Sequence, residues 1–207
     1  MDSPIDLADL TGVVLAGGRG SRMGGVDKGR QLFRGEALAA RAAHRLMPQV
    51  SHLLISANRH LDDYRLLAPV VTDTVADFPG PLGGILAALQ VTTTPFLVCV
   101  PCDTPFFPTD LVARLAAAFT DPQLELATAC APDIEAEDGH DTRGVLRSHP
   151  VFALMRTSIA TRLDASLRAG ERRLNAWRMH HNAVEVAFPD GHAFYNVNTL
   201  QALDDAG

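Results

Sequence analysis

LAGGRGSRMGGVDK, at residues 15–28, begins at the end of a short apolar run, residues 13–15, which is typical of a buried strand. Five of its fourteen residues are glycine and three are basic. Glycines allow backbone amides to approach a ligand closely, and successive amides that point into one concavity bind anions. Arginine and lysine side chains add positive charge. The stretch therefore predicts a loop that holds phosphate groups.

Its spacing excludes two well-known phosphate loops. A P-loop requires a glycine, four residues and then Gly-Lys-Ser/Thr, whereas Lys28 follows an aspartate and precedes Gly29. The dinucleotide fingerprint is G-x-G-x-x-G, and its third glycine would fall on Met23 if Gly18 and Gly20 supplied the first two. The loop is therefore of a third type. A flexible surface loop remains the alternative interpretation.

Length and composition favour one soluble globular domain over residues 1–207. Hydrophobic residues make up 47% of the chain and charged residues 20%, as in ordinary globular proteins. A formal net charge of −6 argues against a nucleic-acid partner. No apolar run approaches the length of a membrane helix, and the N-terminus does not resemble a signal peptide. Three cysteines suit a reducing compartment, so we expect a cytoplasmic protein without a membrane partner.

Short apolar runs alternate with helical patterns along the chain. Strands are predicted at Gly12–Leu15, Leu53–Ala57, Val70–Thr72, Phe96–Val100, Leu124–Ala129, Val151–Met155 and Val184–Ala187. Helices are predicted at Leu38–Met47, Leu82–Gln90, Asp110–Phe119, Ser158–Ala169 and Leu174–His181. Such alternation predicts a three-layer α/β fold with a mostly parallel central sheet. The polar stretch 131–149 is interpreted as a mobile loop inside the domain.

Ligands of such sheets bind beyond the carboxyl ends of the strands, so the loops there are the candidate site. Asp103 follows the strand 96–100, and a carboxylate at this point could hold Mg²⁺, which binds carboxylates and substrate phosphates. Capping of the next turn is the alternative role of Asp103. Asp73 could contact a nucleotide or serve only as a turn residue. Asn196 and Asn198 share one face if the chain there is extended.

Several motifs together resemble the family of molybdenum cofactor guanylyltransferases. They are LAGG-x-G-x-RMGG-x-DKG at 15–29, DFPGPLGG at 77–84, PCDTP at 101–105, HP at 149–150, GERR at 170–173 and NVNT at 196–199. The resemblance implies a Rossmann-like nucleotidyltransferase fold of the glycosyltransferase-A type. It also implies an Mg²⁺-dependent reaction in which GTP and the molybdopterin cofactor give molybdopterin guanine dinucleotide and pyrophosphate.

The resemblance also assigns roles to individual residues. Backbone atoms of Leu15, Ala16, Gly17 and Gly18 would bind GTP, and Lys28 would contact its phosphates. Nucleotide contacts are further expected at Ser56, Asp73 and Asp103, and Asp103 is also the expected Mg²⁺ ligand. The expected catalytic residues are Lys28, Asp103 and Arg22. The expected substrate-binding residues are Pro81, Gly83, Asn196 and Asn198.

Two other functions remain open from the sequence. One is a related nucleotidyltransferase that uses CTP or acts on a sugar 1-phosphate. The other is a non-catalytic molybdopterin carrier, which would bind the cofactor without consuming GTP. For a protein that handles the molybdenum cofactor, we expect transient contacts with proteins of cofactor biosynthesis or with molybdoenzymes, because a labile cofactor must be handed on.

Overall fold

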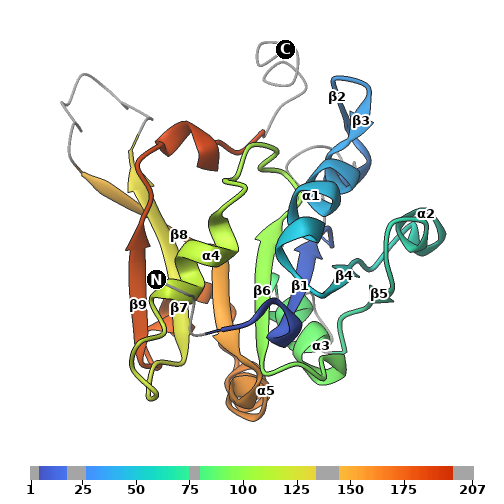
Figure 1. The fold of residues 1–207 in the computed structure, drawn as a ribbon. Coiled ribbons are helices and arrows are strands. Elements are labelled where there is room, and N and C mark those ends of the chain that lie inside the picture. Colours follow the sequence, from blue (N-terminus) through green and yellow to red (C-terminus); the bar gives the residue numbers. More distant parts are fainter. Residues whose placement is uncertain (1–4, 18–26, 75–79, 134–144, 198–207) are drawn as a thin grey trace.

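The computed structural model describes residues 5–17, 27–74, 80–133 and 145–197, and a seven-stranded sheet forms its middle layer (Figure 1). The strands are β1 (Leu10–Leu15), β4 (His52–Ser56), β5 (Val70–Val71), β6 (Phe96–Pro101), β7 (Leu126–Pro132), β8 (Leu146–Arg156) and β9 (Ala183–Ala187). Their order is β5-β4-β1-β6-β8-β7-β9. Only β8 is antiparallel to its neighbours in this sheet of the described chain. The predicted mostly parallel α/β sheet is confirmed.

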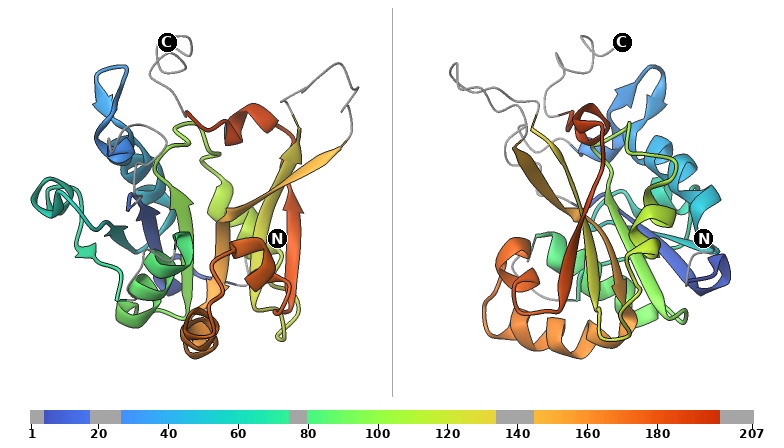
Figure 2. Two further views of the ribbon diagram at one scale, coloured as in Figure 1. Left: turned by 180° about the vertical axis from the view of Figure 1, so that it is seen from behind. Right: turned by 60° about the vertical axis from the view of Figure 1, so that its left-hand side comes forward.

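Helices cover both faces of the sheet (Figure 2). Apolar side chains of α1 (Leu38–Leu46) and α4 (Leu111–Ala117) pack on one face. Those of α3 (Pro81–Val91), α5 (Ala160–Arg168) and α6 (Leu174–Arg178) pack on the other. Successive residues of a strand point to opposite faces, so Val13 and Val14 of β1 are fully buried in different clusters. This double burial explains why the strands appear in the sequence as continuous apolar runs. Within the described residues, no helix has the length and apolar character needed to cross a membrane.

Two small features escape prediction because they are too short to show a period. One is a hairpin of β2 (Leu32–Phe33) and β3 (Glu36–Ala37), and the other is the helix α2 (Leu61–Arg65). The predicted helix 174–181 is shorter in the structure and ends at Arg178. The predicted helix 158–169 begins with a 3₁₀ turn, Thr157–Ile159, before α5.

The prediction of a mobile loop over residues 131–149 is wrong at both ends of that stretch. β7 continues to Pro132, and β8 begins at Leu146. Residues 134–144 lie outside the described part of the chain. This end of β8 is not covered on both faces, and its residues 146–150 range from half-buried to exposed. It therefore lacks the continuous apolar run from which the other strands were predicted.

β8 leaves its neighbour β6 before β6 ends, so the sheet forks at this point. The two strands pair from Phe96 with Arg156 as far as Cys99 with Ala153. β6 then continues to Pro101 paired with β1 only, while the first residues of β8 remain paired with β7. The ribbon views show the β7–β8 arms leaning away from the end of β6 (Figures 1 and 2). The fork opens a space between segments that continuous pairing would have closed.

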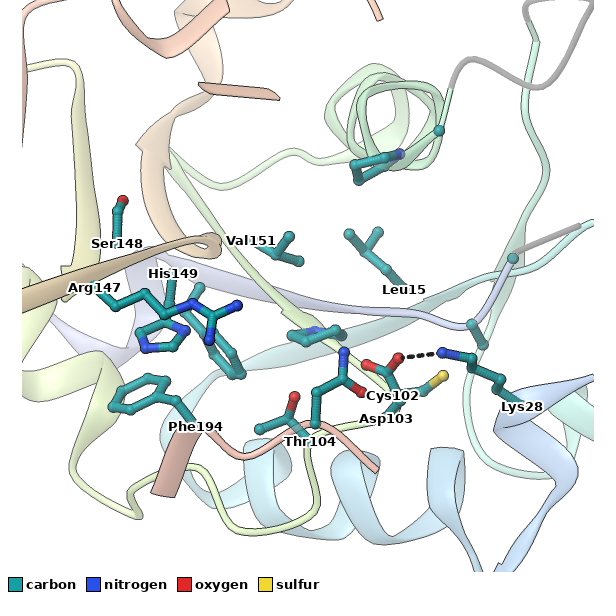
Figure 3. A pocket seen from close by; sticks show the side chains of 17 residues that line it. Leu15, Lys28, Cys102, Asp103, Thr104, Arg147, Ser148, His149, Val151 and Phe194 are labelled. Atoms are coloured by element: carbon teal, nitrogen blue, oxygen red, sulfur yellow. Dashed lines mark hydrogen bonds and ion pairs between the residues drawn. The ribbon is translucent and has the colours of Figure 1, made fainter. Parts of the chain in front are cut away.

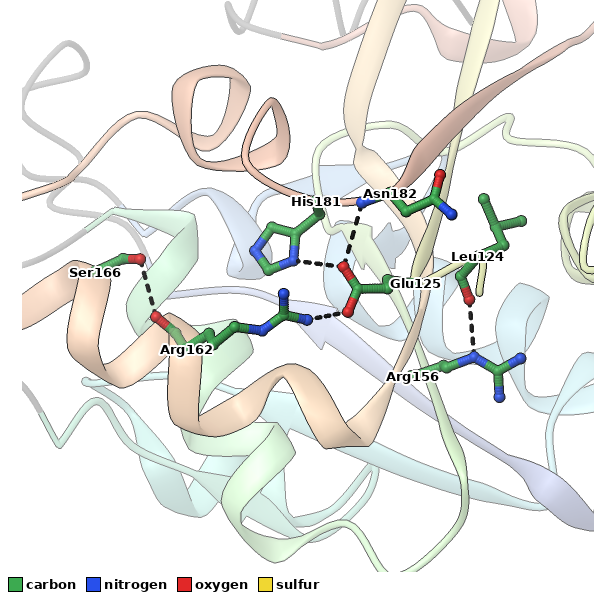
Figure 4. A network of polar contacts seen from close by, with 7 residues as sticks. All are labelled: Leu124, Glu125, Arg156, Arg162, Ser166, His181 and Asn182. Atoms are coloured by element: carbon green, nitrogen blue, oxygen red, sulfur yellow. Dashed lines mark hydrogen bonds and ion pairs between the residues drawn. The ribbon is translucent and has the colours of Figure 1, made fainter. Parts of the chain in front are cut away.

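A polar network fastens the opposite end of the sheet (Figure 4). Glu125, just before β7, pairs with Arg162 of α5, and accepts hydrogen bonds from the His181 ring at 3.3 Å and the Asn182 amide at 3.2 Å. Burial opposes ionisation of Glu125, but these partners lower its pKa overall. Burial, and then the nearby Arg162 charge, lowers the pKa of His181. At neutral pH the network thus joins α5 and the start of β9 to β7 as a carboxylate, a guanidinium and a neutral imidazole.

Candidate functional site

A cavity of about 590 Å³ opens at the carboxyl ends of β1 and β6, within the fork between β6 and β8 (Figure 3). Its lining comes from segments far apart in the sequence. The lining residues are Leu15, Ala16, Gly17, Lys28, Gly80, Pro81, Pro101, Cys102, Asp103, Thr104, Arg147, Ser148, His149, Val151, Phe152, Phe194 and Asn196. Seven of the residues predicted as site residues are among them: Leu15, Ala16, Gly17, Lys28, Pro81, Asp103 and Asn196.

The first residues of the glycine loop are held by the two strands that flank β1. The Ala16 amide donates to the Ser56 carbonyl at 2.8 Å, and the Cys102 amide donates to the Leu15 carbonyl at 3.1 Å. These bonds continue the parallel pairing of β4, β1 and β6 one step beyond the strands. The backbone at 15–17 therefore enters the cavity in a fixed direction, which is a requirement for binding a ligand through main-chain groups.

Lys28 and Asp103 meet at the edge of the cavity, and both side chains line it. Lys28 Nζ lies 3.1 Å from Asp103 Oδ2, and the exposed fractions of the two side chains are 30% and 14%. Asp103 follows the end of β6, and its carbonyl accepts a 2.9 Å bond from the Val197 amide. That bond draws the preceding residue, Asn196, to the cavity wall. The pair places one cation and one carboxylate where a charged ligand would meet both.

A buried tyrosine fixes the backbone around Lys28. The Tyr64 hydroxyl of α2 donates to Asp27 Oδ1 at 2.7 Å, and the same oxygen accepts a 3.1 Å bond from the Gly29 amide. Burial raises the pKa of Tyr64, and the Asp27 carboxylate raises it further, so the hydroxyl stays protonated and remains a donor. Any side chain at Gly29 would collide with this hydroxyl. Lys28 thus stands on a turn that is held independently of its own side chain.

Asp73 forms a reciprocal pair with Asn58. The Asn58 amide donates to Asp73 Oδ2 at 2.9 Å, and the Asp73 backbone amide donates to Asn58 Oδ1 at 2.9 Å. Burial raises the pKa of Asp73, and the Asn58 bond partly opposes that rise. Neither residue is part of the cavity lining in the described chain. The nucleotide contact of Asp73 therefore stays a prediction.

Ser56 and Gly83 are buried beneath the cavity and not on its wall. Ser56, at the end of β4, is 2% exposed, and its hydroxyl faces the backbone of Gly84 in α3. Gly83 is buried within α3, which begins at Pro81. The expected ligand contacts of Ser56 and Gly83 stay predictions. Gly18, Arg22 and Asn198 lie outside the described residues.

The close approach of α3 to β4 leads to a stability prediction at Gly84. A methyl group at residue 84 would collide with Ser56 Oγ and lie 3.2 Å from Leu15 Cδ2. We expect Gly84→Ala to lower the free energy of unfolding by about 1–3 kcal/mol, the usual cost of overpacking. The measurement is urea unfolding. Adding Ser56→Ala should recover part of the loss, with Ser56→Ala alone as the control. A Gly84→Ala protein as stable as the original would contradict this packing.

Several lining residues were not predicted as site residues from the sequence. Arg147, His149 and Phe152 come from β8, and Phe194 comes from the 3₁₀ helix η6 (Gly191–Phe194). The imidazole of His149 stacks on Phe194 with ring centroids 4.7 Å apart and planes at 16°. The His149-Pro150 dipeptide had been noted in the sequence, but no chemical role followed from it. Only the fork brings it opposite Lys28.

The cavity suits a divalent cation only if a ligand supplies most of the coordination. Within the described residues, Asp103 is the only carboxylate of the lining, and no group of three or more His, Cys, Asp or Glu could hold a metal by itself. Mg²⁺ is commonly held by one or two carboxylates together with substrate phosphates. The donor set therefore fits an ion that arrives with a phosphorylated ligand.

Cys99 and Cys102 lie three residues apart at the end of β6, and Cys102 borders the cavity. Cys99, Cys102 and Cys130 are buried free thiols. Burial raises the pKa of Cys99 to about 12 and also raises that of Cys102. Because the thiolate is the reactive form, both groups are inert near neutral pH. Cys99 and Cys102 therefore serve as small buried side chains.

Comparisons of the sequence with known proteins point to one family, and comparisons of the structure show the same fold. Residues 12–184 match the family described as "MobA-like NTP transferase domain". A molybdenum cofactor guanylyltransferase of Ralstonia nicotianae is 49% identical over an alignment of 202 residues, and the alignment covers 96% of each chain.

Solved structures with the same fold are more distant in sequence. Molybdopterin-guanine dinucleotide biosynthesis protein A of Archaeoglobus fulgidus has a TM-score of 0.65 at 21% identity, covering 95% of this chain and 96% of its own. A 4-diphosphocytidyl-2C-methyl-D-erythritol synthase of Anaerococcus prevotii has a TM-score of 0.72 at 8% identity, covering 97% of each chain. At these identities the likeness concerns the fold alone.

Proposed function

This chain belongs to the molybdenum cofactor guanylyltransferases, within the MobA-like NTP transferase family, and on that premise we propose how its residues perform guanylyl transfer. Its reaction joins the GMP part of a nucleotide to the molybdenum cofactor. We infer that GTP is the donor, that Mg²⁺ accompanies it, and that Lys28 and Asp103 are the main catalytic residues. The observation that carries this proposal is the 3.1 Å Lys28–Asp103 pair beside the fixed backbone of residues 15–17.

The proposed reaction is a direct displacement at phosphorus. A terminal phosphate oxygen of molybdopterin attacks the α-phosphorus of GTP, a new P–O bond forms, and the bond to the leaving pyrophosphate breaks. A phosphate monoester is already ionised near neutral pH, so the step needs no general base. Positioning and charge neutralisation are then the main contributions of the protein. These are contributions that a fixed backbone, a lysine and a carboxylate can make.

Each of these groups has a separate task in the proposed mechanism. Amides of the loop that begins at Leu15 bind the triphosphate, and Lys28 balances the charge that develops on pyrophosphate. Asp103 would hold the Mg²⁺ that, when bound, neutralises phosphate oxygens. Arg22, Asn196 and Asn198 are proposed to face the substrates. The 14% exposure of the Asp103 side chain limits competition from water for its oxygens.

The proposed setting of the enzyme follows from the chemistry of its product. A labile cofactor has to be received and delivered, so we propose transient contacts with proteins of cofactor biosynthesis or with molybdoenzymes. Nothing in the net charge of −6 favours nucleic acid as a partner. The buried free thiols are compatible with the cytoplasmic location that we propose.

A nucleotide panel tests the choice of donor. With molybdopterin and Mg²⁺ present, we expect GTP to give pyrophosphate and the dinucleotide at least about 10-fold faster than CTP or ATP. The readouts are pyrophosphate release and chromatography of the dinucleotide. Faster turnover with CTP would point to the cytidylyl-transferring alternative. Tight cofactor binding without nucleotide consumption would point to a carrier.

A further inference from the structure

The fork of the sheet gives the cavity two walls of different chemistry. Lys28 and the backbone of residues 15–17 form one wall, next to β1 and β4. Arg147, His149 and Phe194 belong to the other wall, next to β8 (Figure 3). Asp103, at the end of β6, lies between the two walls. One wall is therefore available to a second ligand when the other is occupied by a nucleotide.

A three-residue bulge in β8 shapes this second wall. Thr128 of β7 pairs with Ala153, but the next residue, Ala129, pairs with His149. Residues 150–152 of β8 consequently have no partners in β7, and Pro150 has no amide hydrogen to donate. The Val151 carbonyl instead accepts a bond from the Cys99 thiol of β6 at 3.0 Å. Bulges next to active sites commonly redirect side chains, and this one brings Val151 and Phe152 into the cavity lining.

Arg147 and His149 stand two residues apart on this strand, so they share one of its faces. Figure 3 shows the Arg147 guanidinium pointing into the cavity, on the side away from Lys28. Its ion pair with Asp133 spans 3.8 Å, with exposed fractions of 49% and 23%, and such long surface pairs contribute little. A guanidinium has five N–H donors, so the ion pair with Asp133 does not by itself exclude a phosphate on Arg147.

His149 adds a flat, supported surface to the same wall. Phe194 is 4% exposed and covers one side of the imidazole, and it also packs edge-on against Phe152 with centroids 5.0 Å apart. His149 is itself one of the residues that line the cavity. A ring held from behind in this way stays in one orientation, which favours stacking against a planar ligand.

We propose that this wall of β8 and η6 binds the acceptor: Arg147 holds its phosphate, and His149, backed by Phe194, stacks against its planar heterocycle. The proposal rests on the proposed function, because it takes GTP to occupy the wall at Lys28. A guanidinium matches two phosphate oxygens at once, so Arg147 would fix the attacking group as well as bind it. The separation of the walls across Asp103 places the two phosphates on either side of the carboxylate.

Substitution at Arg147 provides the first test. We expect Arg147→Ala to raise the KM for molybdopterin about 10- to 100-fold, as is usual for a lost charge-assisted hydrogen bond. Arg147→Lys should recover part of the loss, because lysine keeps the positive charge but lacks the paired N–H donors of a guanidinium. GTP affinity, measured by calorimetry, should change less than about 3-fold, within the scatter of surface substitutions. Arg168→Ala is the matched control, because it removes the same charge from an α5 side chain that is 77% exposed.

Substitution at His149 tests the stacking separately. We expect His149→Ala to raise the KM for molybdopterin about 10-fold, and His149→Phe, which keeps a flat ring, to stay within about 3-fold of the original. Melting temperatures of both variants show whether loss of the His149–Phe194 stacking destabilises the fold. Normal acceptor KM in Arg147→Ala and His149→Ala, with GTP binding intact, would overturn the proposal. Failure of the unaltered protein to bind GTP would instead count against the proposed function.

Discussion

Replacing Asp103 with alanine should reduce the rate of guanylyl transfer on the order of 10²-fold or more. Asp103 is the only carboxylate in the described lining of the cavity, and it lies between the two walls. Its loss removes the proposed Mg²⁺ ligand and leaves Lys28 without its 3.1 Å partner. The measurement is dinucleotide formation by the purified variant at saturating GTP and molybdopterin. A higher Mg²⁺ requirement in Asp103→Asn would connect the loss with the metal.

The fold should survive this substitution. The structural bond of residue 103 is made by its backbone carbonyl, which accepts from the Val197 amide, and alanine keeps that carbonyl. Asp110→Ala is the matched control, since it removes a carboxylate that is 60% exposed from the segment that follows Asp103. Near-normal turnover by folded Asp103→Ala enzyme would rule out the metal role. Equal losses in both variants would indicate a general effect of charge.

Lys28→Ala should also lower turnover on the order of 10²-fold, with little change in melting temperature. The physical reason is that the backbone and the side chain of Lys28 make separate contacts. The backbone at Lys28 is anchored through Asp27, Tyr64 and the Gly29 amide, whereas only the side chain reaches Asp103. Removing the side chain should therefore remove charge from the cavity without releasing the turn. Rates and thermal unfolding curves of the same preparation check both parts of the prediction.

The lysine and the aspartate should not act independently. The two groups touch, so their effects on the activation free energy should overlap. The increases caused by Lys28→Ala and by Asp103→Ala should therefore sum to more than the increase in the double variant. Arg30→Ala is the matched control for Lys28, since it lies in the same 3₁₀ turn but pairs outward with Asp63 at 2.9 Å. If Arg30→Ala were as impaired as Lys28→Ala, the effect would belong to the turn and not to the lysine. Full additivity would contradict a shared role.

Much of the fold could be predicted from local sequence because each central strand is buried on both faces. The runs at β1, β4 and β6 are apolar for this reason, and the helices between them show the complementary period. The same information located Lys28 and Asp103. Lys28 ends the loop that leaves β1, and Asp103 lies two residues after the end of β6. Parallel strands bring their carboxyl ends to one edge, so the meeting of these residues followed from the fold class.

The remaining lining could not be predicted, because it depends on how distant segments pair. Arg147 and His149 lie in a polar stretch that resembles a loop, and only pairing with β7 makes it a strand. The bulge at residues 150–152 and the early separation from β6 are properties of register, which no local pattern encodes. Likewise, Ser56 stands at the end of a strand, and only the tertiary structure places its hydroxyl against the backbone of Gly84.

The amino-acid sequence by itself thus determined the layers, the glycine loop and the positions of its lysine and of the aspartate after β6. Its patterns report whether a segment is buried, and burial is a local property of each strand and helix. The tertiary structure alone decided which polar residues face the cavity, because strand order, register and the bulge set the direction of every side chain at the fork. Strand order, register and the bulge depend on contacts between residues far apart in the chain, and together they form the second wall of the cavity.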